Sequence, residues 1–328
     1  MNKRLLLRSC AVGALFLGFG LSVPEAAAQQ WPERPVTIVT PFSPGVSPDV
    51  AARILADGLS KRWKQPVVVE NRPGADTMIG TQGFIDKRDS HTLLFTTHAT
   101  FTVVPLLYEK VSYDPVKDVS PISLAVEDFL GVVVAPNLPV NSLSDFVGLA
   151  REKPGQMNFF TVPGVPYLAY LTFQKRAAIE TTFVGYSNPG GAMNDMAEGR
   201  IHIAVLPLAM ALGPVRSGRM KLIAVTNGVR TPAAPEAPSV LEAGYQDLSF
   251  GGLLGMFGPK DMSPALRQQI ATDLKAVLAD PETRKRLQDV GLIARGTTPE
   301  EFASELDAQR AKWSAVAREN NIKPQQPR

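Results

Sequence analysis

Side chains that could perform chemistry are scarce in this chain of 328 residues. It has three histidines, and its single cysteine, Cys10, lies near the N-terminus. No two histidines have metal-ligand spacing, and neither His-Glu-x-x-His nor Gly-x-Ser-x-Gly occurs. A nucleophile with a nearby base, as covalent catalysis requires, is therefore not evident. We expect a protein that is not an enzyme and that uses no metal and no other cofactor.

One histidine stands apart by its position. His91 precedes a predicted strand and His202 lies within one, which fits structural or surface roles. His98 follows a strand end, and ligands of open α/β sheets bind beyond the carboxyl ends of strands. We therefore expect His98 to line a pocket.

Four short turns at predicted strand ends offer a different chemistry, the capture of an anion. Each carries glycine, proline or hydroxyl residues and precedes a predicted helix. A helix start has unpaired backbone N–H groups and the positive end of a dipole, so it can hold a carboxylate without lysine or arginine. The same residues also suit ordinary strand-to-helix turns, so both interpretations stay open. The turns are residues 41–49, 96–100, 160–166 and 185–191.

The elements around these turns follow an alternating pattern. Short β-branched runs alternate with helical stretches, which is typical of an α/β sheet with crossover helices. Ten strands exceed what one compact sheet usually holds, so we predict two lobes, each a mainly parallel sheet flanked by helices, with a ligand cleft between them. The predicted strands are 36–40, 67–70, 92–96, 122–126, 131–135, 158–160, 181–184, 201–206, 221–226 and 253–257.

Helical spacing and start signals predict the helices, and expected crossings between the lobes near Gly131 and near Gly251-Gly252 give the lobe boundaries. We predict a helix over 49–64 with Asp49 as its N-cap. Lobe 1 is expected to comprise residues 29–130 and 253–328, and lobe 2 residues 131–252. Further helices are predicted at 144–152, 167–177, 189–198, 264–278 and from 298 onward.

Residues 1–28 carry the signals of a secretory leader. A basic start is followed by an apolar run, residues 11–21, and by a small-residue cleavage site ending at Ala28. The run is too short to span a bilayer. We predict export to the periplasm of a Gram-negative bacterium, which would leave a mature chain without cysteine.

The charge balance argues against a nucleic-acid partner. The chain has 34 basic and 31 acidic residues, and 31 and 30 remain without the leader, a net charge of +1. No run of lysine or arginine forms a basic stripe. We therefore expect no nucleic acid among the partners.

Several sequence blocks, in the same order along almost the whole mature chain, resemble the substrate-binding proteins of tripartite tricarboxylate transporters, also called Bug proteins. The blocks are residues 31–39, 41–49, 65–75 with Ile79-Gly80, 113–118, 153–156, 224–226, 238–244 and 280–284. The resemblance implies the two-lobed fold of periplasmic binding proteins, without enzyme activity. It also implies a monomer that closes on a small organic acid and delivers it to integral membrane subunits. A ligand-sensing subunit for a two-component kinase is the alternative function.

The resemblance also implies ligand-binding positions, because turns in both lobes of this family hold a ligand carboxylate through backbone N–H groups and ordered water. By position these are Phe42, Ser43, Pro44, Gly45, Val46, Ser47 and Asp49 in lobe 1 and Thr161, Val162, Pro163, Gly164 and Val165 in lobe 2. Thr97 and His98 would line the cleft, and Tyr186 and Ser187 would close its far side.

Departures from the family pattern bear on the ligand. Val46 follows Gly45 where the family has a second glycine, and a β-branched residue would resist a positive φ there. Apolar Leu206 or Pro207 stands where an aspartate is common, and Ser187 stands where a lysine is usual. The cleft should therefore be less polar than in relatives, which favours an aromatic or otherwise hydrophobic acid.

Overall fold

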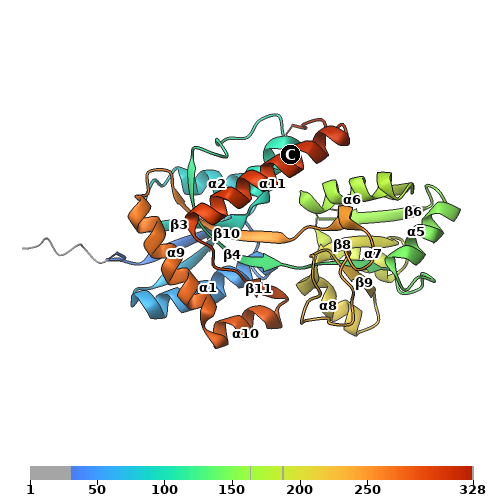
Figure 1. Cartoon of the computed structure of the whole chain (residues 1–328), viewed down its shortest axis with the longest axis horizontal. Coiled ribbons are helices and arrows are strands. Elements are labelled where there is room, and N and C mark those ends of the chain that lie inside the picture. Colours follow the sequence, from blue (N-terminus) through green and yellow to red (C-terminus); the bar gives the residue numbers. More distant parts are fainter. Residues whose placement is uncertain (1–30, 163, 187, 327–328) are drawn as a thin grey trace, which may run out of the picture.

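Two separate β-sheets organise the chain (Figure 1). The structure, a computed structural model, describes residues 31–162, 164–186 and 188–326, so the predicted leader lies outside the described residues. The six-stranded sheet has the order β11-β4-β10-β3-β1-β2, and the five-stranded sheet has the order β7-β6-β8-β5-β9. We call the first sheet with its helices lobe 1 and the second lobe 2. The predicted two-lobed α/β fold is thereby confirmed.

The lobe 1 sheet mixes parallel and antiparallel neighbours. Its strands are β1 (Val36–Thr40), β2 (Val67–Asn71), β3 (Thr92–Thr97), β4 (Val119–Asp128), β10 (Gly252–Pro259) and β11 (Leu292–Ala294). β1 is parallel to β2 and β3, whereas β10 is antiparallel to both β3 and β4. β11 is antiparallel to β4. Strands β1 to β4 therefore point the same way, and β10 and β11 run against them.

The lobe 2 sheet follows a similar plan. Its strands are β5 (Leu130–Val134), β6 (Met157–Thr161), β7 (Thr181–Phe183), β8 (Ile203–Pro207) and β9 (Lys221–Val225). β6 is parallel to β7 and β8, and β5 is antiparallel to β8 and β9. All but β5 therefore share one direction, which brings the carboxyl ends of several strands to one edge.

Helices cover the sheets. They are α1 (Ser47–Trp63), α2 (Met78–Ile85), α3 (Ala99–Thr102), α4 (Val104–Leu107), α5 (Leu143–Glu152), α6 (Val165–Arg176), α7 (Pro189–Ala197), α8 (Leu208–Arg216), α9 (Pro264–Ala279), α10 (Pro281–Asp289) and α11 (Pro299–Glu319). On the lobe 1 sheet, Ile38 and Phe95 pack with α1 and α9, whereas Val39 and Leu94 pack with α2 and α11. Alternating side chains of one strand thus feed two cores on opposite faces.

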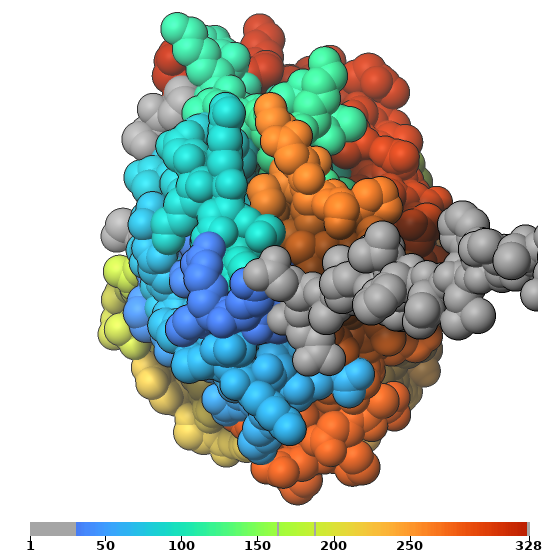
Figure 2. All heavy atoms as spheres, turned by 90° about the vertical axis from the view of Figure 1, so that its left-hand side faces the viewer, coloured from blue at the N-terminus to red at the C-terminus, as the bar shows by residue number. Residues whose placement is uncertain are grey.

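Lobe 1 is built from two distant stretches of sequence. Figure 2 looks at the lobe 1 end and shows early segments, in blue, beside segments from the region of residues 250–300, in orange. Asp273 of α9 accepts hydrogen bonds from Arg62 Nε at 2.5 Å and from Trp63 Nε1 at 2.8 Å, both at the end of α1. The numbered lobe boundaries given above stay a prediction.

The chain connects the lobes at neighbouring places. β4 passes into β5 at Asp128 and Leu130, and residues 226–251 lead back from β9 to β10. Glu127 Oε1 accepts a hydrogen bond from Asn227 Nδ2 at 2.7 Å and joins the two connections. Helix α11 extends from lobe 1 to α6 (Figure 1), where Asn320 Nδ2 donates to Thr172 Oγ1 at 3.0 Å.

Among residues 31–162, 164–186 and 188–326, no helix combines the length and the apolar character that crossing a bilayer requires.

Candidate ligand-binding site

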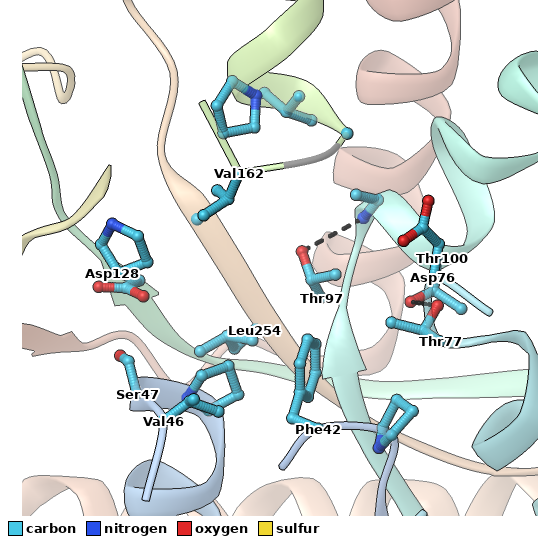
Figure 3. Close-up of a pocket in the computed structure, with 18 of the residues that line it drawn as sticks. Phe42, Val46, Ser47, Asp76, Thr77, Thr97, Thr100, Asp128, Val162 and Leu254 are labelled. Atoms are coloured by element: carbon cyan, nitrogen blue, oxygen red, sulfur yellow. Dashed lines mark hydrogen bonds between the residues drawn. The ribbon is translucent and has the colours of Figure 1, made fainter. Parts of the chain in front are cut away.

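A cavity of about 510 Å³ lies where the two lobes meet (Figure 3). Residues of both lobes line it, including Ser47 and Thr97 from lobe 1 and Val162 and Met210 from lobe 2. Its volume falls in the range of small-molecule sites, roughly 300 to 1,000 Å³. The cavity is therefore large enough to enclose a metabolite.

The starts of five helices of at least eight residues reach the cavity wall, besides those of the four-residue helices α3 and α4. The residues at these starts that line the cavity are Val46 and Ser47 of α1, Thr77 of α2, Gly164 and Val165 of α6, Pro189 of α7 and Pro207 of α8. The helices begin here because strands of each sheet end at this edge and the chain turns back. Their unpaired N–H groups and dipoles favour a negative charge in the cavity.

The charged side chains of the cavity are acidic. Asp76 and Asp128 line it, and none of the described lining residues is lysine or arginine. An anionic group of a ligand would therefore depend on backbone N–H groups rather than on a cationic side chain.

The turn before α1 is held by a buried aspartate. Asp49 is 2% exposed and accepts hydrogen bonds from the Gly45 N–H at 2.8 Å, from Arg53 Nε at 3.1 Å and from Asn71 Nδ2 at 2.7 Å. Burial alone would raise the pKa of Asp49, but these hydrogen bonds outweigh it and the pKa is lowered. Asp49 thus fixes the turn through these hydrogen bonds.

The prediction that Asp49 caps this helix is wrong, because the N-cap is Val46. Val46 has φ −80° and ψ 160°, which is extended backbone, and Gly45 takes the positive φ of 85°. The concern that a β-branched residue would resist the turn is thereby removed. Pro48 follows in the first helical turn and has no N–H to offer a ligand.

Among the described residues of the corresponding turn in lobe 2, no side chain caps the helix start. Gly164 is the N-cap of α6, with φ 90°, and carries no side chain that could cap the helix. Val165 follows at the cavity wall, and Pro166 lacks an N–H. Thr161, at the end of β6, is buried, and its hydroxyl has no hydrogen-bond partner among the described residues.

His98 lines the cavity as a neutral side chain. It is 1% exposed, and burial, together with the charge of Lys312, lowers its pKa to about 3. Its Nδ1 lies 3.0 Å from Thr102 Oγ1, and this hydroxyl donates to the His98 carbonyl oxygen at 3.1 Å. Because the hydroxyl proton is used there, Nδ1 is the donor of the pair and Nε2 is left as an acceptor.

A second part of the lobe 1 wall has a strained backbone. Ala75, Asp76 and Thr77 have φ values of 44°, 47° and 78°, a conformation that costs free energy in residues other than glycine. The Tyr108 hydroxyl donates to Asp76, and Thr77 Oγ1 lies 3.0 Å from Thr100 Oγ1. The sequence analysis missed this segment, although the 65–75 block and the Pro73-Gly74 turn before α2 pointed toward it.

Asp128 is the other polar residue that the sequence analysis missed. It ends β4, is 6% exposed, and its Oδ1 has no hydrogen-bond partner among the described residues. Burial raises its pKa to about 7, although hydrogen bonds from the Ser47 hydroxyl and the Phe129 N–H favour the ionised form. The sequence feature that could have identified Asp128 is its position, a carboxyl residue at the end of an apolar strand.

Many, but not all, of the predicted site residues line the cavity. Those that do are Phe42, Ser43, Val46, Ser47, Thr97, His98, Val162, Gly164 and Val165. Pro44, Gly45, Asp49, Thr161 and Tyr186 are described but are not among the lining residues. The Tyr186 ring packs on Phe160 at 5.5 Å and its hydroxyl donates to Asp195. Pro163 and Ser187 lie outside the described residues.

Comparison with protein families agrees with this geometry. Residues 51–322 match the family described as the tripartite tricarboxylate transporter family receptor. Among curated proteins, the chain is similar to "Protein BugT" of Bordetella pertussis, with 27% identity over 98% of this chain and 99% of that protein.

Solved structures show the same likeness. "R. palustris Rpa4515 with adipate" is 27% identical, with a TM-score of 0.82 over 90% of this chain and 100% of that one. "MatC (Rpa3494) from Rhodopseudomonas palustris with bound malate" is 25% identical, with a TM-score of 0.75 over 87% and 99% of the two chains. Both likenesses extend over most of the chain and therefore include residues of both lobes.

Proposed function

The chain belongs to the tripartite tricarboxylate transporter receptor family, and from that premise we propose that it captures a small organic carboxylate in the periplasm and delivers it to the membrane subunits of such a transporter. Family and fold are those of substrate-binding receptors, which supports a role in binding rather than catalysis. Two similar proteins were solved with adipate and with malate, so a carboxylate ligand suits the family.

One observation carries this proposal. The starts of two helices, one from each lobe, line the same cavity, and none of the described lining residues has a cationic side chain. The α1 start contributes Val46 and Ser47, and the α6 start contributes Gly164 and Val165. Their free N–H groups can hold a carboxylate from both lobes, and the dipoles of both helices add to the attraction. Such a grip requires both lobes, so binding would favour the closed arrangement.

The apolar part of the cavity supports a hydrophobic acid. Phe42, Val162 and Leu254 lie around its centre in Figure 3, and Met210 and Phe250 add further apolar surface. Burying an apolar side chain there would contribute about 25 cal/mol per Å². An aromatic or aliphatic acid would therefore bind more tightly than a small, strongly polar one.

Titration calorimetry with the mature chain tests whether the helix-start N–H groups bind the ligand carboxylate. The ligands are acids without a polar substituent beside the carboxylate, adipate and 3-phenylpropanoate. Ser47→Pro removes the amide hydrogen and the hydroxyl of Ser47, whereas Ser47→Ala removes the hydroxyl alone. Val46 already has the extended backbone that precedes proline, and proline is well accepted at a first helical position, so the fold should survive.

We expect Ser47→Pro to weaken binding of the better acid by about tenfold or more, since a hydrogen bond to a charged group contributes about 1.5 to 3 kcal/mol. Ser47→Ala should bind that acid almost as the unaltered protein does. Equal affinities for Ser47→Pro and Ser47→Ala would contradict the role of the α1 amides. Native mass spectrometry of protein purified from its own periplasm would identify a co-purified acid, and a bound cation there would contradict the proposal itself.

A further inference from the structure

Helix α11 packs in both lobes (Figure 1). In its first half, Phe302 and Leu306 are buried in a lobe 1 core with residues of β3, β4 and β10. In its second half, Trp313 is 1% exposed and belongs to the hydrophobic cluster that fills lobe 2. The chain then returns to lobe 1, where the Gln325 N–H donates to the Leu107 carbonyl oxygen at 2.7 Å. Lobe 1 thus holds α11 at both ends, and lobe 2 holds the part between them.

The contact of α11 with lobe 2 lies at the far end of α6. Lys175 Nζ donates to the Glu319 carbonyl oxygen at 3.0 Å, beside the hydrogen bond between Asn320 and Thr172. The opposite end of α6, at Val165, lines the cavity. Val165 and Lys175 are ten residues apart in one helix, which corresponds to about 15 Å. One end of α6 is therefore held by α11, and the other end faces the ligand.

One of the two chain connections between the lobes passes the same place. The ring of Phe250 lies 6.3 Å from the ring of Trp313, at an angle of 80°. Lys312 Nζ donates to the Ser249 carbonyl oxygen at 3.1 Å. Groups near a rotation axis move least, whereas a lobe rotation of about 15° would displace a point 15 Å from the axis by about 4 Å. A rotation centred here would thus leave the α11 contact in place and displace the α6 start.

The apolar character of the contact decides whether it survives opening. A tryptophan side chain buries roughly 150 to 250 Å². Val316 and Ile322 pack against the same cluster as Trp313, so separating α11 from lobe 2 would expose more apolar surface than one side chain. Exposure of apolar surface is unfavourable in proportion to its area, whereas exposed polar contacts contribute little. An opening motion that keeps this contact is therefore strongly preferred.

We propose that the packing of Trp313 in lobe 2 is a third hinge segment, beside the two chain connections, which persists in the open and the closed protein and positions the start of α6 for the ligand carboxylate. This inference rests on the proposed function, because closure around an acid supplies the motion. Trp313 is a positioning residue and is not among the described lining residues of the cavity. Opening moves the α6 start away from lobe 1 while the far end of α6 stays on α11.

A covalent link across the contact tests its persistence. The only cysteine of the chain, Cys10, lies in the predicted leader, so thiols can be placed at will in the mature chain. Lys175→Cys and Glu319→Cys put two thiols at exposed positions, and bismaleimidoethane joins them. Glu319→Cys alone, treated with the same reagent, is the matched control. Calorimetry with adipate and 3-phenylpropanoate gives affinity, and small-angle X-ray scattering with and without acid gives closure.

We expect the linked protein to bind the better acid within about twofold, or about 0.4 kcal/mol, of the unlinked double variant. Its radius of gyration should decrease on binding as much as that of the control. A linked protein that binds the acid much more weakly, or that shows no change in radius, would mean that the contact must break during the motion, and the inference would be overturned.

The positioning role has a separate readout. Trp313→Ala should weaken acid binding about tenfold, or about 1.4 kcal/mol, because the α6 start is then ordered only when the ligand binds. Trp313→Phe, which keeps an apolar ring, should restore most of the affinity. The link between residues 175 and 319 should also restore it in Trp313→Ala, which a general loss of stability would not explain. A folded Trp313→Ala variant with unchanged affinity, or without rescue by the link, contradicts the positioning role.

Tryptophan fluorescence reports the contact without a change at Trp313. The chain has three tryptophans, so Trp31→Phe with Trp63→Phe leaves Trp313 alone. Quenching by acrylamide should be equally weak with and without acid, and Trp313→Phe, which keeps the two lobe 1 tryptophans, is the matched control. Stronger quenching of Trp313 in the absence of acid overturns the inference. If circular dichroism shows that Trp313→Ala does not fold, this measurement and the linked protein decide the matter.

Failure of the inference and failure of the proposed function give different results. Normal binding by the unlinked chain, with loss of binding or of closure after linking, overturns the inference and leaves the proposed function standing. A mature chain that binds neither acid before any substitution overturns the proposed function, and the inference falls with it.

Discussion

The two walls of the cavity differ in chemistry. Lobe 1 contributes the titratable groups of the lining, Asp76, His98 and Asp128, together with several hydroxyl groups. On the lobe 2 side, the described lining residues are glycine, proline or apolar, as Val162 and Met210 illustrate. Among the described lining residues, lobe 1 therefore has side chains that can discriminate polar substituents, whereas lobe 2 offers backbone amides and apolar contact.

The largest expected effect tests how the lobe 1 wall is held in place. Asp49→Ala removes the acceptor for Gly45, Arg53 and Asn71, and three hydrogen bonds to a buried charge are worth about 4.5 kcal/mol together at the low end of the usual range. We expect the free energy of unfolding in urea to fall by about that amount, with ligand binding lost. Because the pKa of Asp49 is lowered in the folded protein, its stabilisation is present above the ordinary value of 3.8 and is lost as the pH falls further.

The matched control lies in lobe 2. Asp145 completes the capping box of α5 with Ser142, but it is exposed and far from the cavity lining. Asp145→Ala should therefore cost clearly less stability than Asp49→Ala and should leave ligand affinity unchanged. Equal losses of stability for the two variants would show that the α1 turn has no special brace.

The second prediction contrasts the two buried aspartates of lobe 1. The folded protein holds the Asp128 proton up to about pH 7, whereas the unfolded chain loses it near 3.8. The folded state thus binds more protons in this window, so the contribution of Asp128 to the free energy of unfolding falls as the pH rises from 4 to 7. This sign is opposite to that of Asp49.

Asp128→Asn removes the ionisation and should be more stable than the unaltered protein by about 2 kcal/mol at pH 8 without ligand. At pH 4 the two proteins should differ little. Urea unfolding curves at both pH values provide the measurement. A variant that is destabilised equally at pH 4 and pH 8 would contradict a costly ionisation of Asp128 in the folded protein.

Most of the fold could be predicted from the sequence because local patterns determine it. Each of the ten predicted strands overlaps an observed one, since short β-branched runs, several of them buried on both faces, give a strong signal. The three-residue strand β11 was missed because so short a segment has no period. Helix α2 was missed because it contains Gly80 and Gly83, which lower helix propensity. Gly80 is needed for packing, since a Cβ there would lie 2.5 Å from the Arg72 carbonyl oxygen.

The site could be predicted only where it depends on local chain features. The turns at residues 42–47 and 162–165 were found because proline and glycine mark a strand-to-helix turn. Asp128 was missed because its burial depends on the β4–β10 pairing, which places Gly252 opposite it, and a tertiary contact leaves no local pattern. Ala75 to Thr77 were missed because positive φ is not expected of three consecutive residues other than glycine.

The third prediction concerns the polarity of the two walls. It uses two substitutions in which the new side chain has nearly the same volume as the old one. Val162→Thr places a hydroxyl group in the lobe 2 wall, and Thr97→Val removes one from the lobe 1 wall. We expect Val162→Thr to weaken binding of 3-phenylpropanoate about fivefold, or about 1 kcal/mol, because the hydroxyl must lose water without gaining a partner. Thr97→Val should leave that affinity unchanged or improve it slightly. Improved binding by Val162→Thr would contradict an apolar role for lobe 2.

The smallest effect concerns backbone strain. Ala75 in the lobe 1 wall and Ala178 on the lobe 2 surface have nearly the same φ, 44° and 47°, so they form a matched pair inside and outside the cavity. Glycine adopts this conformation without a steric penalty, although it also loses more entropy on folding. Ala75→Gly and Ala178→Gly should therefore each raise the free energy of unfolding by about 0.5 to 1 kcal/mol. Only Ala75→Gly should also change acid affinity, because the loop it loosens carries Asp76 and Thr77 at the cavity wall. Unchanged affinity in Ala75→Gly would mean that the strain of this segment helps to start α2 and does not affect the ligand. The polar wall of lobe 1 that matters for binding would then consist of the residues around Ser47, His98 and Asp128.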